Sequence, residues 1–147
     1  MWRNNNPGNI RYNPKFKGVI GKDARGFSIF KNHLYGIRAM RVLIQNYIRK
    51  RGINTIAGIV NRYAPAADNN KPLLYAKYVS QQTGIPMNQR ILLSQVDMII
   101  PAMVRMETGK SLAPNDIKDS YNPEGKMTWI PPALLAAFLY LLSKIKA

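Results

Sequence analysis

Apolar residues recur at steps of three and four along the middle of the chain, which is the period of an amphipathic helix. The pattern predicts four helices, over about 34–51, 55–63, 72–83 and 94–108. Three of them stop at a glycine and one stops before a proline, as helices commonly do. The chain therefore predicts a mainly helical core between residues 34 and 108.

The first thirty residues follow a different pattern. Residues 3–12 are rich in asparagine and contain Pro-Gly, which favours a structured loop over a helix. Two apolar runs, 19–20 and 27–30, then flank the polar stretch 21–26, which predicts a short β-hairpin. The expected fold class is mainly α (α+β), with a small N-terminal β-hairpin and a C-terminal apolar helix.

The C-terminal part changes composition twice. We expect a folded domain over 1–111, a polar linker over 112–127 and an apolar helix over 128–147. The uncharged run 127–143 is just long enough for a membrane span, which takes about 17–25 residues. Two prolines shorten its helical part to a length common in core helices, so packing in the core is the alternative to a membrane anchor.

The net charge of the chain indicates which molecules it attracts. It holds 22 Lys+Arg against 7 Asp+Glu, a net charge of +15, which attracts polyanions such as nucleic acid, anionic lipid or bacterial envelope polymers. No nucleic-acid motif is recognisable, so no specific nucleic acid is expected. The chain has no cysteine and one histidine, which excludes thiolate and multi-histidine metal sites, and we expect no cofactor. Its first residues lack the apolar stretch of a signal peptide.

Glu107 is the most informative of the seven acidic residues. On a helix it shares one face with four apolar residues, Val96, Ile99, Ile100 and Met103. Burial and the carbonyl end of the helix dipole both raise the pKa of such a carboxyl group. A carboxyl group that stays protonated near neutral pH is what a glycosidic general acid requires. The alternative is that Glu107 turns outward or pairs with a buried arginine.

Asparagine side chains near the N-terminus form a second candidate site. Amides can bind sugar hydroxyls and N-acetyl groups through a planar donor and acceptor. The candidates are Asn4, Asn5, Asn6 and Asn9. A turn that hydrogen-bonds to itself explains them equally well. Asp68 stands in an asparagine-rich loop and is either a ligand-facing carboxylate or a turn residue.

Other polar residues are expected to be structural. Asp97 is interpreted as a helix cap, Asp23 as a turn residue of the hairpin, and His33 as a surface or packing residue. Several tyrosines at helical spacing are expected to pack in the core rather than stack on sugars: Tyr47, Tyr63, Tyr75 and Tyr78.

The motif Arg-Asn-Asn-Asn-Pro-Gly-Asn-Ile at residues 3–10 resembles the opening of a domain of bacteriophage virion and lysis proteins. The likeness continues through 27–30, 36–39, 59–70 and 107–109, and so covers about residues 2–110. Such proteins look like lysozyme-type or lytic-transglycosylase-type peptidoglycan cleavers. Where that domain carries Ser-Glu-Asn-Asp-Thr after its Ala-Pro, this chain has Ala-Asp-Asn-Asn, without the glutamate.

The resemblance implies that 1–111 is a lysozyme-like catalytic domain that cleaves the bond between N-acetylmuramic acid and N-acetylglucosamine. The order of the elements makes us infer a circularly permuted relative. Glu107 is then the general acid/base, and Asp68 is the candidate second carboxylate. Residues expected to bind the glycan are Arg3, Asn4, Asn5, Asn6, Asn9 and Tyr63. With so few acids, a lytic transglycosylase using one glutamate is favoured over a hydrolase.

The implied partners are bacterial peptidoglycan, a membrane through 128–147, and other virion proteins. The implied location is the phage virion, in contact with a membrane, or the host envelope during entry or lysis. The alternative from another class is a non-catalytic, basic minor capsid protein that binds nucleic acid or membrane. The position of Glu107 on an apolar helix face discriminates between the two, because a binding protein has no use for a buried carboxyl group there.

Overall fold

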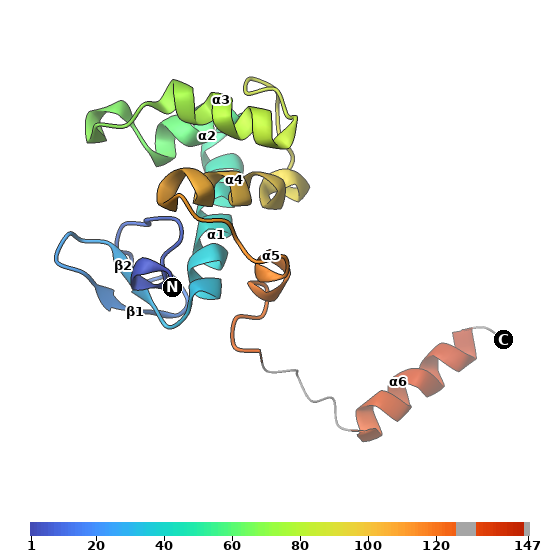
Figure 1. Ribbon diagram of the computed structural model, residues 1–147. Coiled ribbons are helices and arrows are strands. Elements are labelled where there is room, and N and C mark those ends of the chain that lie inside the picture. Colours follow the sequence, from blue (N-terminus) through green and yellow to red (C-terminus); the bar gives the residue numbers. More distant parts are fainter. Residues whose placement is uncertain (126–131, 146–147) are drawn as a thin grey trace.

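The computed structural model describes residues 1–125 and 132–145 (Figure 1). This part of the chain is mainly helical, with one two-stranded antiparallel hairpin, as expected. The strands are β1 (Val19–Lys22) and β2 (Ser28–Phe30), and short 3-10 turns lie at η1 (Arg3–Asn5), η2 (Ala66–Asp68) and η3 (Leu93–Gln95). The helices are α1 (His33–Arg51), α2 (Ile56–Tyr63), α3 (Pro72–Thr83), α4 (Val96–Thr108), α5 (Asp116–Asp119) and α6 (Pro132–Ile145).

Helix α1 is the centre of the fold and contacts α4, α5, η1 and β2. In Figure 1 the hairpin lies towards one end of α1, α2 and α3 lie towards the other, and α4 crosses between them. The Asn32 side chain caps α1 by accepting from the amides of Leu34 and Tyr35 at 3.0 and 3.3 Å. The helix ends at Gly52, whose φ of 65° is the left-handed conformation that glycine adopts at low cost. Both ends of α1 are therefore set by local sequence.

The core lies between α1, α2, α3 and α4. The predicted apolar face of α4, from Val96 to Met103, is buried. On α3, the spacing of apolar residues predicts that Leu74, Tyr75 and Val79 are buried. Tyr75 and Val79 are buried, but Leu74 is 56% exposed. That expectation was wrong because the face towards α2 and α4 is made by Tyr75, Ala76 and Val79, and Leu74 lies about 100° away from Tyr75 around the helix.

Two details of the predicted helix starts differ. The sequence predicts Asn54 or Thr55 as the cap of α2, and Thr55 caps the helix by accepting from the Gly58 amide at 3.1 Å. Helix α4 begins at Val96 rather than at Ser94, because residues 93–95 form a 3-10 turn. Asp97 is not a helix cap: its carboxylate accepts from Nε of Arg41 on α1 at 2.6 Å and from the hydroxyl of Tyr121.

The described part of the expected linker, residues 112–125, packs on α1 instead of forming a free connection. Asp116 and Ser120 are buried, and Asp116 accepts from the His33 ring at 2.9 Å. A guanidinium nitrogen of Arg41 donates to the Ser120 hydroxyl at 2.8 Å and to the Ile117 carbonyl at 3.1 Å. The polar residues that indicated a linker are thus the ones that attach this segment. Residues 126–127 lie outside the described part.

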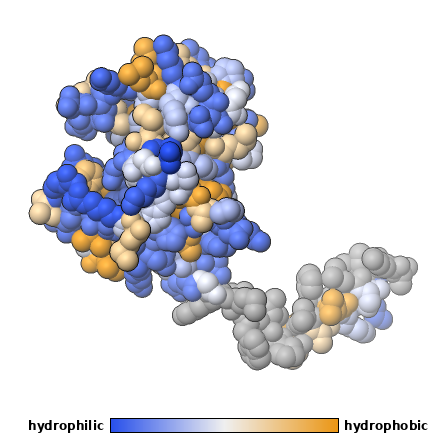
Figure 2. Space-filling model, viewed as in Figure 1, coloured by the Kyte–Doolittle hydropathy of each residue, from blue (hydrophilic) through white to orange (hydrophobic). Residues whose placement is uncertain are grey.

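Helix α6 stands apart from the other helices in Figure 1, and Figure 2 shows the main body presenting a mostly hydrophilic face. The exposed apolar residues of α6 include Leu134, Leu139, Tyr140 and Leu141, each more than half exposed. No helix in the described ranges combines the length and the hydrophobicity that crossing a bilayer requires. Of the segment predicted over 128–147, residues 128–131 and 146–147 lie outside the described residues.

Candidate active site

A cavity of about 580 Å³ lies where the N-terminal loop, α1, α2 and the end of α4 meet. Residues from all four elements and from the turn after α2 line it. They include Asn9, Arg11, Phe27, Tyr47, Arg62, Tyr63, Asp68 and Glu107. The fold therefore brings residues nearly 100 positions apart in sequence into one concave site.

Glu107 reaches this cavity from the last turn of α4, just before Gly109 ends the helix. The side-chain amide of Asn9 donates to Oε2 of Glu107 and to its backbone carbonyl, both at 3.1 Å. The hydroxyl of Tyr75, on α3, donates to Oε1 at 3.0 Å. Within the described ranges Glu107 forms no ion pair, so it is not the partner of a buried arginine.

Burial raises the pKa of the Glu107 carboxyl group above its ordinary value of 4.5. The hydrogen bonds from Asn9 and Tyr75 act in the opposite direction, because both donors stabilise the ionised form. Desolvation is the larger effect, so the direction agrees with the expectation from the sequence. The carboxyl group retains its proton at higher pH than an exposed glutamate does.

Tyr63 and Gly8 position the loop that carries Asn9. The Tyr63 hydroxyl donates to the Gly8 carbonyl, and a Cβ atom at Gly8 would lie 2.5 Å from the Tyr63 oxygen and from a Met40 carbon. Only glycine permits so close an approach of the loop. Asn9 itself has a φ of 48°, a conformation that asparagine tolerates better than most residues. Burial and the nearby Glu107 both raise the pKa of Tyr63.

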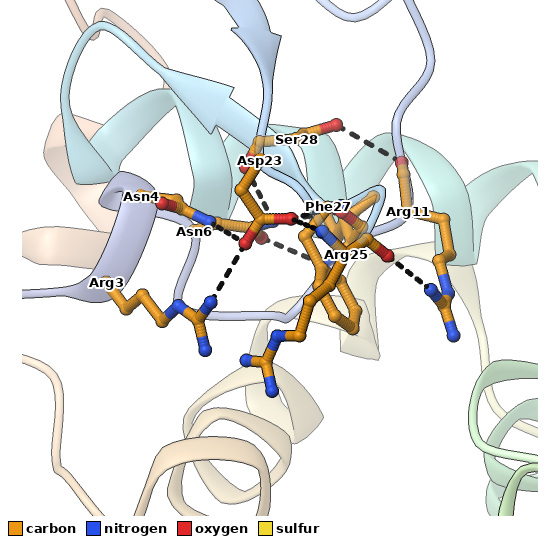
Figure 3. Close-up of polar contacts among 9 residues, drawn as sticks. Arg3, Asn4, Asn6, Arg11, Asp23, Arg25, Phe27 and Ser28 are labelled. Carbon is orange, nitrogen blue, oxygen red and sulfur yellow. Dashed lines mark hydrogen bonds and ion pairs between the residues drawn. The ribbon is translucent and has the colours of Figure 1, made fainter.

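Arg3 and Asn4, expected to bind the glycan, instead bind the hairpin turn (Figure 3). Arg3 donates to the Asp23 carboxylate at 3.1 Å and Asn4 donates to it at 2.8 Å. The other carboxylate oxygen of Asp23 accepts from the amides of Arg25 and Phe27. Hydrogen bonding by the Phe27 amide lowers the pKa of Asp23, opposed by desolvation. Neither Arg3 nor Asn4 lines the cavity, so their predicted role in binding is not supported.

The side chains of Asn5 and Asn6 also form hydrogen bonds within the protein. Asn5 donates to the carbonyls of Phe30 and Lys31. Asn6 is buried and donates to the carbonyls of Ile10 and Ser28 at 2.9 and 3.0 Å, while its oxygen accepts from the Ile10 amide. These side chains satisfy backbone groups that would otherwise lack partners. The interpretation as a self-bonded turn fits Asn6 in part, through its bonds to Ile10, whereas Asn5 bonds to carbonyls 25 and 26 residues away. Among the four asparagines, Asn9 alone lines the cavity.

Asp68 lies in η2 and lines the same cavity as Glu107. Its backbone amide donates to the Pro65 carbonyl. The structure thus brings Glu107, Asp68, Asn9 and Tyr63 together and leaves Arg3, Asn4, Asn5 and Asn6 outside. In the described residues, no three or more His, Asp or Glu side chains gather as a metal site would require.

Three residues at the site were not predicted to contribute to it. Tyr75 and Tyr47 were assigned to core packing from their helical spacing, and both are indeed largely buried. The Tyr75 hydroxyl nevertheless donates to Glu107, and Tyr47 lines the cavity. The helical spacing of apolar residues does not predict either contact. The only feature of the sequence that singles out Arg62 is that a basic residue stands beside an aromatic one, Tyr63.

No family model matches the chain. It is 35% identical over 114 residues to Protein P5 of Pseudoalteromonas phage PM2, and the match covers 74% of this chain and 71% of that protein. Identity at this level over most of both sequences indicates common descent. The chain belongs to the same protein family as Protein P5 of Pseudoalteromonas phage PM2.

Proposed function

We propose that the protein is a phage peptidoglycan glycosidase that cleaves the bond between N-acetylmuramic acid and N-acetylglucosamine, with Glu107 as general acid and base. The observation that carries this proposal is the Glu107 carboxyl group at the cavity, partly buried, with a raised pKa and held by Asn9 and Tyr75. A protein that only binds a polymer gains nothing from a desolvated carboxyl group, which costs stability. The kinship with a phage protein agrees with the proposal.

The placement of Glu107 also supports a lysozyme-like arrangement in permuted order. Helix α4 ends at Glu107, and Asn9 from the N-terminal loop donates to the carboxylate at 3.1 Å. The hairpin contributes Phe27 to the same cavity. A glutamate at a helix end that faces a hairpin and an amide is the constellation expected for such a cleaver.

The favoured reaction is a lytic transglycosylation that uses one carboxyl group twice. Protonated Glu107 donates its proton to the glycosidic oxygen as the bond from the muramoyl C1 breaks. The carboxylate then takes the proton of the muramoyl 6-hydroxyl, whose oxygen bonds to C1 and closes a 1,6-anhydro ring. Glu107 is protonated again at the end, so the reaction consumes no water and needs no second carboxylate.

Hydrolysis with Asp68 as the second carboxylate is the alternative reaction at this site. Asp68 lines the cavity, and no other acidic residue among those described lines it besides Glu107. In a hydrolase, Asp68 would activate water or stabilise the positive charge at C1. The two reactions leave different products, an anhydro ring or a reducing end.

The net charge of +15 would hold the enzyme on the anionic wall and, with α6, on a membrane surface. We place it accordingly in the virion or at the host envelope during entry or lysis. The same charge favours one competing function, a non-catalytic basic capsid protein. That protein would have no product to release from peptidoglycan.

Mass spectrometry of soluble products from purified peptidoglycan tests the proposal. The wild type and a control, Asp119→Asn, should release anhydro-muropeptides, while Glu107→Gln should release about 10²–10⁴-fold less. Asp119 is exposed and lies outside the cavity, so the control makes the same carboxyl-to-amide change without touching the site. Reducing-end products would assign hydrolysis and direct the next substitution to Asp68. No product from the wild type would reject the glycosidase.

A further inference from the structure

Tyr47 presents an unused hydroxyl group to the cavity. The residue is only 8% exposed, it lines the cavity, and its hydroxyl makes no hydrogen bond to any residue in the described part of the chain. No fully buried side-chain oxygen or nitrogen in that part lacks a partner. The Tyr47 oxygen must therefore be reached by solvent, and the cavity is the space that it lines. It is a donor aimed at whatever occupies the cavity.

Arg62 supplies a positive charge to the same cavity. It lies in the last turn of α2, lines the cavity and is exposed, and among the described residues it pairs with no carboxylate. Tyr47 on α1 and Arg62 on α2 line the same cavity. Burial raises the pKa of Tyr47, and the positive charges of Arg62 and Arg51 oppose that rise. A phenol hydroxyl and a guanidinium group that line one cavity can both donate to an anion held there.

A second guanidinium group faces the same cavity. Arg11 lies over the Phe27 ring, 4.5 Å from its centre, and donates to the Arg25 carbonyl at 3.0 Å (Figure 3). These contacts hold it in place without neutralising it. The carboxyl groups of the cavity, Asp68 and Glu107, form no ion pair with Arg11 or Arg62.

We infer that Tyr47 and Arg62 bind a carboxylate of the glycan substrate, with Arg11 adding positive charge to the cavity. This inference rests on the proposed function and names the feature that distinguishes the substrate from neutral polymers of N-acetylglucosamine. Peptidoglycan offers a carboxylate from two sources. One is the peptide stem, and the other is the lactyl group of the muramoyl residue after the stem has been removed.

Calorimetric titration of the Glu107→Gln protein, which cannot turn over the ligand, tests the inference. The ligands are glycan fragments of two disaccharide units with their stems, the same fragments after amidase treatment, and the neutral N-acetylglucosamine tetramer. In this background we compare Arg62→Gln and Tyr47→Phe with the control Arg49→Gln. Arg49 is an exposed cation at the end of α1 outside the cavity, so the control removes an equal charge.

Arg62→Gln should weaken binding of a carboxylate-bearing fragment by tenfold or more, and Tyr47→Phe by severalfold, as expected for charge-assisted hydrogen bonds. Binding of the neutral tetramer and of every ligand to the control should change little. A loss confined to stem-bearing fragments assigns the peptide carboxylate, and a loss confined to amidase-treated fragments assigns the lactyl carboxylate. Equal losses for all three ligands, or none, would overturn the inference.

Cleavage by the protein that retains Glu107 separates this inference from the proposed function. Product release together with no dependence on the substrate carboxylate would remove the subsite and leave the glycosidase. No product release together with selective loss of binding in Arg62→Gln would remove the glycosidase and leave a carboxylate-binding glycan site.

Discussion

At the residue scale, the Glu107 carboxyl group is under two opposing influences. Asn9 and Tyr75, 98 and 32 residues away in sequence, donate to its two oxygens and favour ionisation. Burial favours the neutral form and is the larger effect. An acid that is fixed in orientation and keeps its proton to higher pH than an exposed glutamate can deliver that proton to one position in the cavity. Asn9 and Tyr75 are thus positioning residues for Glu107.

Replacing Tyr75 with phenylalanine should raise the pKa of Glu107 further. The substitution removes a hydrogen bond to the ionised carboxylate and leaves the desolvation in place, so the protonated form gains. Carbon-13 NMR titration of the carboxyl group measures the change, and the alkaline limb of the activity profile should move to higher pH with it. Tyr78→Phe, on the same helix but outside the cavity, is the control. A lowered or unchanged Glu107 pKa would contradict the assignment of Tyr75.

Glu107 should also lower the free energy of unfolding at pH values above its ordinary pKa of 4.5. The folded state binds the Glu107 proton more tightly than the unfolded state does, so the free energy of unfolding falls as pH rises from about 4.5 through the raised pKa. Glu107→Gln has no such proton and keeps a polar group for Asn9 and Tyr75. The variant should therefore gain stability relative to wild type between acidic and neutral pH, measured by urea unfolding at a series of pH values. A constant difference across that range would contradict the raised pKa.

At the element scale, the segment 112–125 is attached to α1 by a few polar contacts. Arg41, 4% exposed, joins α1 to Asp97 of α4, to the Ile117 carbonyl and to the Ser120 hydroxyl, and its guanidinium carbon lies 3.9 Å from the centre of the Tyr121 ring. One side chain on α1 thus organises α4 and the residues after it.

Arg41→Met should destabilise the protein by about 2–4 kcal/mol, because Asp97 and the Ser120 region lose their partner in a largely buried place. Hydrogen exchange resolves where the loss acts, and amides in 112–125 should exchange faster than those of α2 and α3. Lys118→Met removes an exposed charge of the same segment and should change stability by no more than about 0.5 kcal/mol. Uniformly faster exchange would show that Arg41 supports the whole core instead.

At the scale of the whole molecule, a basic body is joined to an apolar helix. The chain has a net charge of +15, and α6 exposes Leu134, Leu139, Tyr140 and Leu141. A helix that is apolar on most of its surface is stable in water only against another apolar surface. Positive charge near such a helix favours anionic lipid as that surface. We propose that α6 lies in the interface of an anionic bilayer.

Flotation of the full chain with vesicles containing phosphatidylglycerol tests this proposal. The double change Leu139→Lys and Leu141→Lys should reduce the bound fraction, with partitioning about tenfold weaker or more, since two leucines no longer enter the apolar region. The control Leu73→Lys and Leu92→Lys adds the same charge at exposed leucines of the main body and should bind as well as the wild type or better. Equal binding of all three proteins would assign the attraction to charge alone.

The amino-acid sequence alone predicts the features that depend on near neighbours along the chain. Helix ends at Gly52, Gly84 and Gly109, the cap at Thr55, the hairpin and the apolar face shared by Glu107 follow from spacing within one helix or one turn. These signals are local because backbone hydrogen bonds in helices and hairpins join residues a few positions apart. The candidate acid was accessible to sequence reasoning for the same reason.

Which polar side chains share a site depends on the tertiary structure. Four asparagines in six residues looked alike, yet Asn6 serves buried carbonyls of its own loop and the hairpin while Asn9 reaches Glu107 across 98 residues. Asp97, predicted to cap its own helix, instead accepts a hydrogen bond from Arg41, 56 residues away. Asp116, in the expected linker, is hydrogen-bonded to His33, 83 residues away. A polar side chain takes the partner that the packed core brings within about 3 Å, and residue spacing along the chain does not encode that choice.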